Sequence, residues 1–309
     1  MKCRKCSNKA VMNMRQHKLP LCREHFLEWI PAQTQRAIEK YRMFQRNKRV
    51  LVAVSGGKDS LSVWGILNDL GYRADGLYIS LGINGGINYS KISQQLSENF
   101  ANRRRLILHV VNVPQEYGAS IPEIAEQTTR GKGRPCSVCG MAKRHIMNRI
   151  AREGDYDVLV TGHNLDDEVA ILFGNTLNWQ AGYLVRQSPI LAANNPGVIR
   201  KAKPLCRIYE REMAAYALLQ EIDYIHDECP FVKGSKSIFY KEFLNRLEAE
   251  RPGAKLSFYL SFLKAKDNGL FSINADPGLA SLHPCPACGQ PTSSPSNCAF
   301  CNMVAAISS

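Results

Sequence analysis

Hydrophobic and polar positions in the middle of the chain follow two alternating patterns. Short runs of β-branched and aliphatic residues, such as RVLVAV at 49–54, are typical of buried strands. Between them lie segments whose apolar residues recur at helical spacing. The expected strands cover 49–54, 73–81, 104–113 and 155–163, and the expected helices cover 58–71, 90–103, 139–152 and 165–178. This alternation predicts an α/β fold with a doubly wound, Rossmann-like parallel sheet.

The flanking parts of the chain have other patterns. Apolar and basic residues alternate at helical spacing over 26–46. From about 207 the chain turns helical, apart from a short strand-like segment, IDYIH at 222–226, that precedes Cys229. An irregular stretch, 267–284, precedes the last cysteines. We therefore expect an N-terminal metal module, a linker helix, the α/β domain, a helical extension and a C-terminal metal module, over 1–30, 31–48, 49–230, 231–280 and 281–309.

Composition and charge narrow the class of protein. The 309 residues contain no apolar run of eighteen or more, so no membrane span is expected, and MKCRKCSNKA lacks a secretory signal core. We expect a cytoplasmic protein, in which the presence of eleven cysteines indicates metal ligation rather than disulfides, because thiols stay reduced there. The net charge of +13 suits a polyanionic partner such as RNA.

Cysteine spacing predicts a zinc site near each end of the chain. Two Cys-x2-Cys pairs near the C-terminus fit a zinc ribbon, and at the N-terminus a Cys-x2-Cys pair is followed by Cys-x2-His. His17 is an alternative fourth ligand at the N-terminus, but the spacing favours His25. Four protein ligands close the coordination sphere, so both sites are expected to be structural. The ligands are Cys3, Cys6, Cys22 and His25, and Cys285, Cys288, Cys298 and Cys301.

A glycine-rich turn follows the first strand of the α/β domain. SGGKDS, residues 55–60, opens a helix, where glycines let the backbone approach an anion and free N–H groups point toward it. Lys58 adds a charge and Ser60 a hydroxyl group. A second polar loop, TGHNLDDE at 161–168, follows another strand. Ligands of open α/β sheets bind where such strand ends meet. The carboxylates of this second loop also fit a simple helix cap.

The Cys-x2-Cys pair in the middle of the chain, Cys136 and Cys139, lacks a second pair nearby. Cys206 lies between apolar residues and is expected in the core, whereas Cys229 precedes a proline in an exposed setting. Three thiolates suit a cubane iron–sulfur cluster with one open iron. A zinc ion with a water ligand and a redox pair are the alternatives.

SGGKDS resembles the signature of the PP-loop ATP pyrophosphatase family, whose members cleave ATP between the α and β phosphates. This resemblance implies that the loop holds the pyrophosphate and that Asp166 or Asp167 lies at Mg²⁺ or the reacting centre. It also implies that the adenosine site includes strand-end residues and the second loop. The implied nucleotide-binding residues are Ala53, Ser55, Gly56, Gly57, Lys58, Asp59, Ser60, Ile79, Gly162 and His163.

Longer segments are similar to the TtuA family of tRNA 2-thiouridine synthetases, namely CSVCGMAKR, GHNLDDEVAILFGNTLNW and HDECPFVKGSKSIFYKE, together with the terminal cysteine groups. The resemblance implies a [4Fe-4S] cluster on Cys136, Cys139 and Cys229, with Cys136 and Cys229 at the reacting centre. It implies catalytic roles for Lys143 and the aspartate pair, with Asp167 the better match. A sulfide on the open iron would then replace the C2 oxygen of an adenylated uridine.

The same resemblance implies tRNA as substrate, a ubiquitin-like sulfur carrier with a C-terminal thiocarboxylate as partner, and a homodimer. T-loop 5-methyluridine is the expected target, and the wobble uridine is the alternative. Two other readings stay open. One is a thiolase without a cluster, in which Cys136 or Cys229 carries a persulfide. The other is a zinc-ribbon RNA-binding protein with a degenerate nucleotide loop.

Overall fold

The computed structural model describes residues 1–193, 197–232, 236–270 and 282–307. Its centre is a six-stranded sheet in the order β5-β4-β3-β6-β8-β7, parallel except for the last strand, β7. The strands are β3 (Arg49–Val54), β4 (Arg73–Ser80), β5 (Leu108–Asn112), β6 (Val158–Thr161), β7 (Ile190–Leu191) and β8 (Arg200–Ala202). The order reverses beside β3, so the ends of β3 and β6 form a topological switch point, where ligands of such sheets bind.

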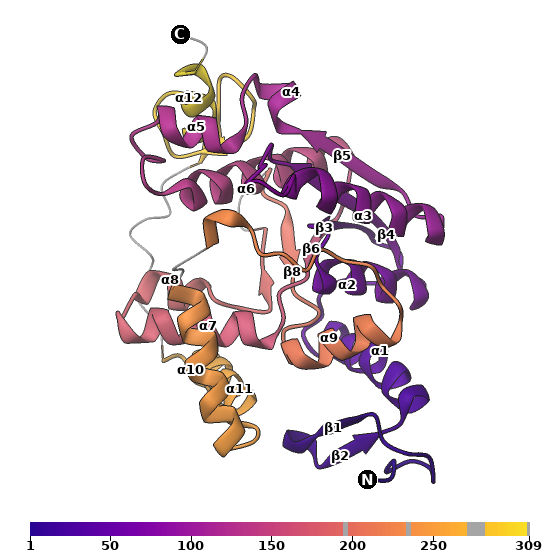
Figure 1. Cartoon of the computed structure of the whole chain (residues 1–309). Helices are drawn as coiled ribbons and strands as arrows, with labels where there is room; N and C mark the ends of the chain where they lie inside the picture. Colours follow the sequence, from indigo (N-terminus) through magenta and orange to yellow (C-terminus); the bar gives the residue numbers. More distant parts are fainter. Residues whose placement is uncertain (194–196, 233–235, 271–281, 308–309) are drawn as a thin grey trace.

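Helices cover both faces of this sheet (Figure 1). The α-helices are α1 (Arg23–Lys40), α2 (Lys58–Asp69), α3 (Tyr89–Arg104), α4 (Val113–Tyr117), α5 (Ile121–Gln127), α6 (Pro135–Glu153), α7 (Leu165–Leu177), α8 (Ala181–Arg186), α9 (Glu210–Leu219), α10 (Lys236–Glu250), α11 (Ala254–Asp267) and α12 (Ala299–Ala305). Two 3-10 helices, η1 (Arg15–His17) and η2 (Pro230–Val232), and two hairpins, β1 (Met12–Met14) with β2 (Leu19–Leu21) and β9 (His283–Pro284) with β10 (Pro291–Thr292), complete the described elements.

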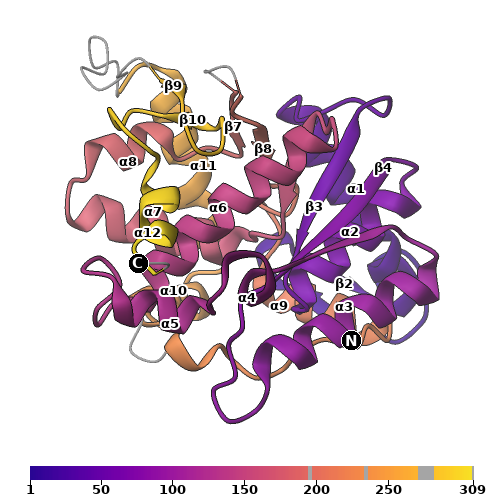
Figure 2. The same ribbon diagram turned by 90° about the horizontal axis from the view of Figure 1, so that it is seen from above.

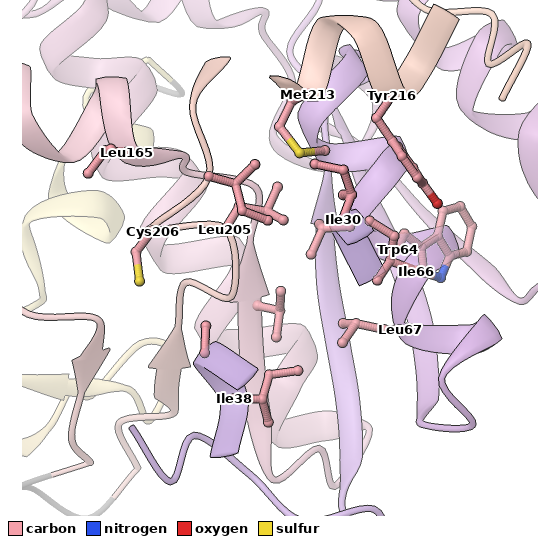
Figure 3. Packing of buried hydrophobic residues seen from close by; sticks show 14 of the residues in the cluster. Ile30, Ile38, Trp64, Ile66, Leu67, Leu165, Leu205, Cys206, Met213 and Tyr216 are labelled. Carbon is pink, nitrogen blue, oxygen red and sulfur yellow. The ribbon is translucent and has the colours of Figure 1, made fainter. Parts of the chain in front are cut away.

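Successive residues of β3 point to opposite faces of the sheet and so belong to two cores. Val50, Val52 and Val54 join the larger core, which includes α1, α2 and α9. Figure 3 shows this packing, with Tyr216 of α9 extending toward Trp64 of α2. Cys206 is fully buried here, as expected, and burial raises the pKa of its thiol to about 12, so it stays a neutral core residue.

Leu51 of β3 faces the second core, which joins α5 and α6 to the C-terminal module. Phe300 of α12 stacks on His145 of α6, with ring centroids 4.1 Å apart. Helix α12 contacts α6 and lies beside it in Figure 2, while the β1–β2 hairpin lies at the opposite end of the molecule (Figure 1). The last module therefore packs directly on the helix that carries the central cysteine pair.

Most expected elements are present, with three differences. The expected strand 104–113 is shorter, because α3 runs to Arg104 and ends at Arg105 in a left-handed conformation. IDYIH is not a strand: Ile225 instead donates its N–H to the Gly56 carbonyl, 2.9 Å away, which fastens this segment to the glycine-rich loop. The short strands β7 and β8 were not expected. Most of the irregular stretch 267–284 lies outside the described residues.

The helical segment expected over 26–46 is α1, which ends at Lys40. Among the helices of the described ranges, none is long and apolar enough to cross a lipid bilayer.

Candidate active site

A cavity of about 430 Å³ opens at the carboxyl ends of β3, β4 and β6. The sequence predicted a ligand site at this edge, and ten of the residues singled out there or beside the central cysteines line it. They are Ala53, Ser55, Gly57, Asp59, Ser60, Ile79, Lys143, Gly162, His163 and Asp167. Tyr89 and Met147 also line it and were not singled out, because a lone aromatic or methionine at a helix position usually belongs to a core.

The glycine-rich loop folds around the start of α2. Gly56 has a φ of +75°, and a Cβ atom there would lie 2.5 Å from the Ser93 carbonyl oxygen. The Ser60 hydroxyl donates to the Gly57 carbonyl at 2.9 Å and accepts the Ser55 N–H at 3.1 Å. The first N–H groups of a helix have no partner within it, and Gly57, Asp59 and Ser60 at the start of α2 line the cavity, an arrangement that suits a phosphate.

The second loop presses against the first. A Cβ atom at Gly162 would lie 2.8 Å from the Ser60 backbone nitrogen, so only glycine allows this approach. Two residues later Asn164 caps α7, accepting the Asp167 N–H at 3.1 Å while Asp167 accepts the Asn164 N–H at 3.0 Å. This reciprocal capping box fixes the Asp167 carboxylate at the cavity wall.

Two carboxylates therefore face the same cavity, Asp59 and Asp167. Burial raises the pKa of Asp59 to about 6, against the effect of Lys58, and the negative charge of Asp167 raises it further. The buried Oδ1 of Asp59 has no hydrogen-bond partner within the described ranges. An unpaired buried carboxylate oxygen beside a second carboxylate is a donor set that suits a hard cation such as Mg²⁺.

Asp166 has a different environment from its neighbour. Its side chain is 4% exposed, accepts the Glu210 N–H at 2.8 Å and forms an ion pair with Lys255 of α11, with the Lys255 Nζ 2.5 Å from Oδ1. It does not line the cavity that Asp167 lines. The structure thus gives two adjacent aspartates different environments, and only Asp167, the better match by resemblance, lines the cavity.

A chain of alternating charges connects the two cavity carboxylates. The Lys58 ammonium lies 3.1 Å from Asp59 and 2.9 Å from Glu210, so it turns away from the cavity that its loop surrounds. Lys241 of α10 lies 3.1 Å from Glu210 and 2.6 Å from Asp167. Glu210 and Lys241 were missed by the sequence analysis, because nothing in their local sequence shows that α9 and α10 pack beside the loop.

The three central cysteines approach one another across two segments. Cys136 and Cys139 lie in the first turns of α6, after Pro135 at its start, and Cys229 immediately precedes η2. The Cys136 thiol lies 3.5 Å from the Phe231 carbonyl oxygen, which ties the helix to the Cys229 segment. Burial raises the pKa of Cys139, Lys143 lowers it, and Cys229 and Cys136 raise it further. The three thiols thus share one electrostatic environment.

The spacing of these thiols differs from that of a single-ion site. Within the part of the chain that the structure describes, the groups whose ligand atoms all lie within 4.8 Å of one another are the two terminal quartets. Thiolates bound to one zinc ion lie about 3.8 Å apart, given Zn–S bonds of about 2.3 Å. A wider set of three soft ligands fits a multi-atom iron–sulfur cluster better than one ion.

The cysteine group adjoins the nucleotide cavity. Lys143, one helical turn beyond Cys139, lines the cavity, and so does Tyr89. Burial raises the pKa of the Tyr89 phenol, and the nearby charges of Cys229 and Cys139 raise it further. Tyr89 and Lys143 therefore lie at the boundary between the nucleotide cavity and the three thiols.

The N-terminal quartet contains the four residues expected from the spacing. Cys22 Sγ lies 3.2 Å and Cys3 Sγ 3.5 Å from His25 Nδ1, and Cys6 Sγ lies 3.7 Å from Cys22 Sγ. His17, the alternative ligand, instead packs on Trp29 with ring centroids 5.4 Å apart. The donor set suits a tetrahedral zinc ion.

The C-terminal quartet is formed in the same way by Cys285, Cys288, Cys298 and Cys301. The Cys298 N–H donates to Cys285 Sγ at 3.1 Å. Burial opposes ionisation of Cys285, but the backbone N–H groups around it outweigh burial and lower its pKa to about 6, which favours the thiolate that a metal ion needs.

Family models match most of the chain. Residues 2–27 match the family model "2-thiouridine synthetase TtuA, N-terminal LIM domain", and residues 30–231 match the PP-loop domain model. A tRNA-5-methyluridine(54) 2-sulfurtransferase of Thermus thermophilus is 47% identical over 303 residues, which cover 98% of this chain and 91% of that protein. One from Pyrococcus horikoshii is 39% identical over 303 residues, covering 98% and 93%.

A solved structure shares the fold. It is the U34-tRNA thiolase NcsA from Methanococcus maripaludis with its [4Fe-4S] cluster, which is 24% identical, covers 98% of this chain and 95% of its own, and has a TM-score of 0.77.

Proposed function

Because the chain belongs to the 2-thiouridine synthetase TtuA family, we propose that it is a tRNA uridine 2-sulfurtransferase acting on 5-methyluridine in the T-loop. The observation that carries the proposal is the position of Cys136, Cys139 and Cys229 beside Lys143 at the edge of the nucleotide cavity. Such an arrangement serves a reaction in which ATP activates an oxygen atom and sulfur then replaces it.

The cavity holds ATP with its phosphates on the glycine-rich loop. Backbone N–H groups of the loop bind the β and γ phosphates, and Asp59 and Asp167 are the ligands for Mg²⁺. The uridine O2 attacks the α-phosphate, pyrophosphate leaves, and the C2 oxygen becomes a good leaving group. Ala53 and Ile79 line the part of the cavity assigned to adenosine.

The sulfur centre is assigned to the three central thiols. Cys136, Cys139 and Cys229 would hold a [4Fe-4S] cluster, which would present the delivered sulfide when bound. Lys143 stabilises negative charge that develops on the phosphate or the base, an electrostatic role suited to an ammonium group at the cavity wall. Tyr89 lines the same cavity as Lys143.

The remaining assignments concern domains and partners. We assign zinc to the terminal quartets and keep the division into 1–30, 31–48, 49–230, 231–280 and 281–309. The basic chain and its terminal modules bind the tRNA phosphates. A ubiquitin-like protein with a C-terminal thiocarboxylate delivers sulfur, and the enzyme acts as a homodimer.

One anaerobic experiment tests the function. The purified protein is incubated with ATP, sulfide and tRNA, and the thiolated nucleotide is mapped by mass spectrometry. We expect 2-thio-5-methyluridine in the T-loop, and thiolation at the wobble position instead would overturn the assignment. If no pyrophosphate is released in the presence of tRNA, the result would favour an RNA-binding protein without catalytic activity.

The Cys229→Ser variant tests the sulfur centre in the same assay. We expect loss of thiolation and of the visible absorption of a cluster, with the zinc content unchanged. Ser137→Ala is the matched control, because Ser137 lies between Cys136 and Cys139 on α6 but is not a proposed cluster ligand. Full activity of Cys229→Ser would contradict the cluster assignment, and activity without visible absorption in the unaltered protein would support the persulfide route.

A further inference from the structure

The charge network behind the phosphate loop has a composition that bears on metal binding. Negative and positive side chains alternate through the network in the spatial order Asp59, Lys58, Glu210, Lys241, Asp167. The nitrogen–oxygen distances of the successive ion pairs are 3.1, 2.9, 3.1 and 2.6 Å. Both ends are carboxylates that line the nucleotide cavity, whereas the three inner groups do not. The inner groups therefore act on the cavity through its two carboxylates.

These five side chains come from separate parts of the fold. Lys58 and Asp59 begin α2, Glu210 begins α9, Asp167 lies in the first turn of α7, and Lys241 lies on α10. Their side chains are 19–36% exposed, so the ion pairs are partly shielded from water and persist at ordinary salt concentration. Glu210 is the hub, because each of its carboxylate oxygens accepts a hydrogen bond from a different lysine.

The position of α10 gives this network a specific origin. The PP-loop domain match ends at residue 231, and α10 begins at Lys236. The helix packs along α7, where a Cβ atom at Gly174 would lie 2.8 Å from the Tyr240 ring and Phe173 stacks on Phe243 with centroids 5.4 Å apart. This close packing fixes the adjacent Lys241 against Asp167, so the C-terminal extension reaches the nucleotide site.

We propose that Glu210 and Lys241 are positioning residues that hold the cavity carboxylates Asp59 and Asp167 in place for a divalent cation and set the net charge that this cation meets. The proposal rests on the proposed function in assigning Mg²⁺ to these carboxylates. Three carboxylates and two ammonium groups give the network a net charge of −1 (−3 + 2). Lys241 acts as a fixed cation for Asp167 before the metal ion arrives.

The charge count predicts opposite effects for the two residues. Glu210→Gln brings the network to zero charge and should weaken cation binding, whereas Lys241→Met brings it to −2 and should strengthen it. One unit charge about 8 Å from a divalent ion, at an effective dielectric constant of about 60, changes affinity about tenfold. The double variant returns to −1, so its affinity should lie within about threefold of the unaltered protein.

The test uses Mn²⁺ as a paramagnetic probe. It is titrated into the full-length protein, with its metals in place and without nucleotide, and free Mn²⁺ is measured by electron paramagnetic resonance. Lys241→Arg, which keeps the charge, should bind Mn²⁺ like the unaltered protein. Thermal unfolding of each variant is recorded alongside, so that a variant that does not fold is replaced by Lys241→Gln or Glu210→Ala, for which the same directions are expected.

Turnover gives the second measurement. If the carboxylates are positioned by this network, both single variants should lower kcat for pyrophosphate release about tenfold or more at saturating Mg²⁺. The double variant should recover the Mn²⁺ affinity but not kcat. A purely structural role would shift Mn²⁺ affinity in the same direction for both single variants, or change it less than twofold, and either result would overturn the proposal.

Failure of this proposal can be told from failure of the proposed function. Mn²⁺ binding needs neither tRNA nor sulfur, so the opposite shifts would still appear in a chain that thiolates no tRNA. If the protein thiolates tRNA but its variants lack the opposite shifts in Mn²⁺ affinity, the proposed function holds and the positioning role of Glu210 and Lys241 is wrong.

Discussion

The buried ion pair between Lys255 and Asp166 makes the Lys255→Met variant a sharp test of the structure. The Lys255 side chain is 2% exposed and that of Asp166 is 4% exposed, and no other pair in the described ranges is buried on both sides to this degree. Methionine keeps the length of the lysine side chain and removes its charge. The substitution leaves the Asp166 carboxylate buried with the Glu210 N–H as its remaining donor.

The expected cost follows from that burial. Removing one partner of a buried ion pair destabilises proteins by about 3–5 kcal/mol, a large part of a typical total stability of about 5–15 kcal/mol. For a chain of this size each kcal/mol lowers the thermal midpoint by about 2–4 °C, so a fall of roughly 6–20 °C is expected. Adding Asp166→Asn removes the stranded charge and should restore part of this loss.

The assay is urea unfolding followed by circular dichroism, with zinc present throughout. Lys48→Met is the matched control, because Lys48 pairs with Asp157 at 2.9 Å but the two side chains are 45% and 36% exposed. Such an exposed pair contributes about 0–1 kcal/mol. The reasoning is refuted if Lys255→Met costs less than about 1 kcal/mol, or if the double variant is less stable than the single one.

Two further predictions concern pH and the phosphate loop. Burial raises the pKa of Glu212 to about 7 from the usual 4.5, so the folded protein retains a proton that the unfolded chain releases, and the free energy of unfolding should fall between about pH 4.5 and pH 7. Glu212→Gln should remove this fall, which is worth up to about 3 kcal/mol. Urea unfolding midpoints of both proteins at pH 5 and pH 8 measure it, and an equal fall in the variant and the unaltered protein would contradict the prediction. Gly56→Ala places a Cβ 2.5 Å from the Ser93 carbonyl and should abolish ATP binding in equilibrium dialysis. Gly86→Ala has a similar φ, +83°, with no atom within 4 Å, and equal loss of binding in this control would disprove the clash.

Features with a local cause were predictable from the sequence. The terminal quartets follow from the spacing of thiols on tight turns, and the phosphate loop from two glycines between a strand and a helix. The position of β3 followed from its β-branched run. Cys229 was selected because Cys206 has apolar neighbours, and the structure buries Cys206 completely and leaves Cys229 partly exposed.

Features that depend on packing between distant segments were not predictable. Asp166 and Asp167 are neighbours in the same local sequence. Asp166 forms a buried ion pair because Lys255, far along the chain, packs against it, whereas Asp167 lines the cavity. Lys241 reaches the site because α10 packs on α7. IDYIH has the alternation of a strand, yet it bonds to the glycine-rich loop at a single N–H and joins no sheet.

The contact between the C-terminal module and α6 has a consequence for the stability of this helix. Gln290 lies 3.0 Å from Asn148, and Phe300 stacks on His145, on the helix that begins with the central cysteine pair. Gln290 and His145 are 145 positions apart, so this side of α6 is covered by a distant part of the chain. Loss of order in the C-terminal module would uncover this side of α6, so the helix that bears Cys136 and Cys139 is coupled to the folding of a module far along the chain.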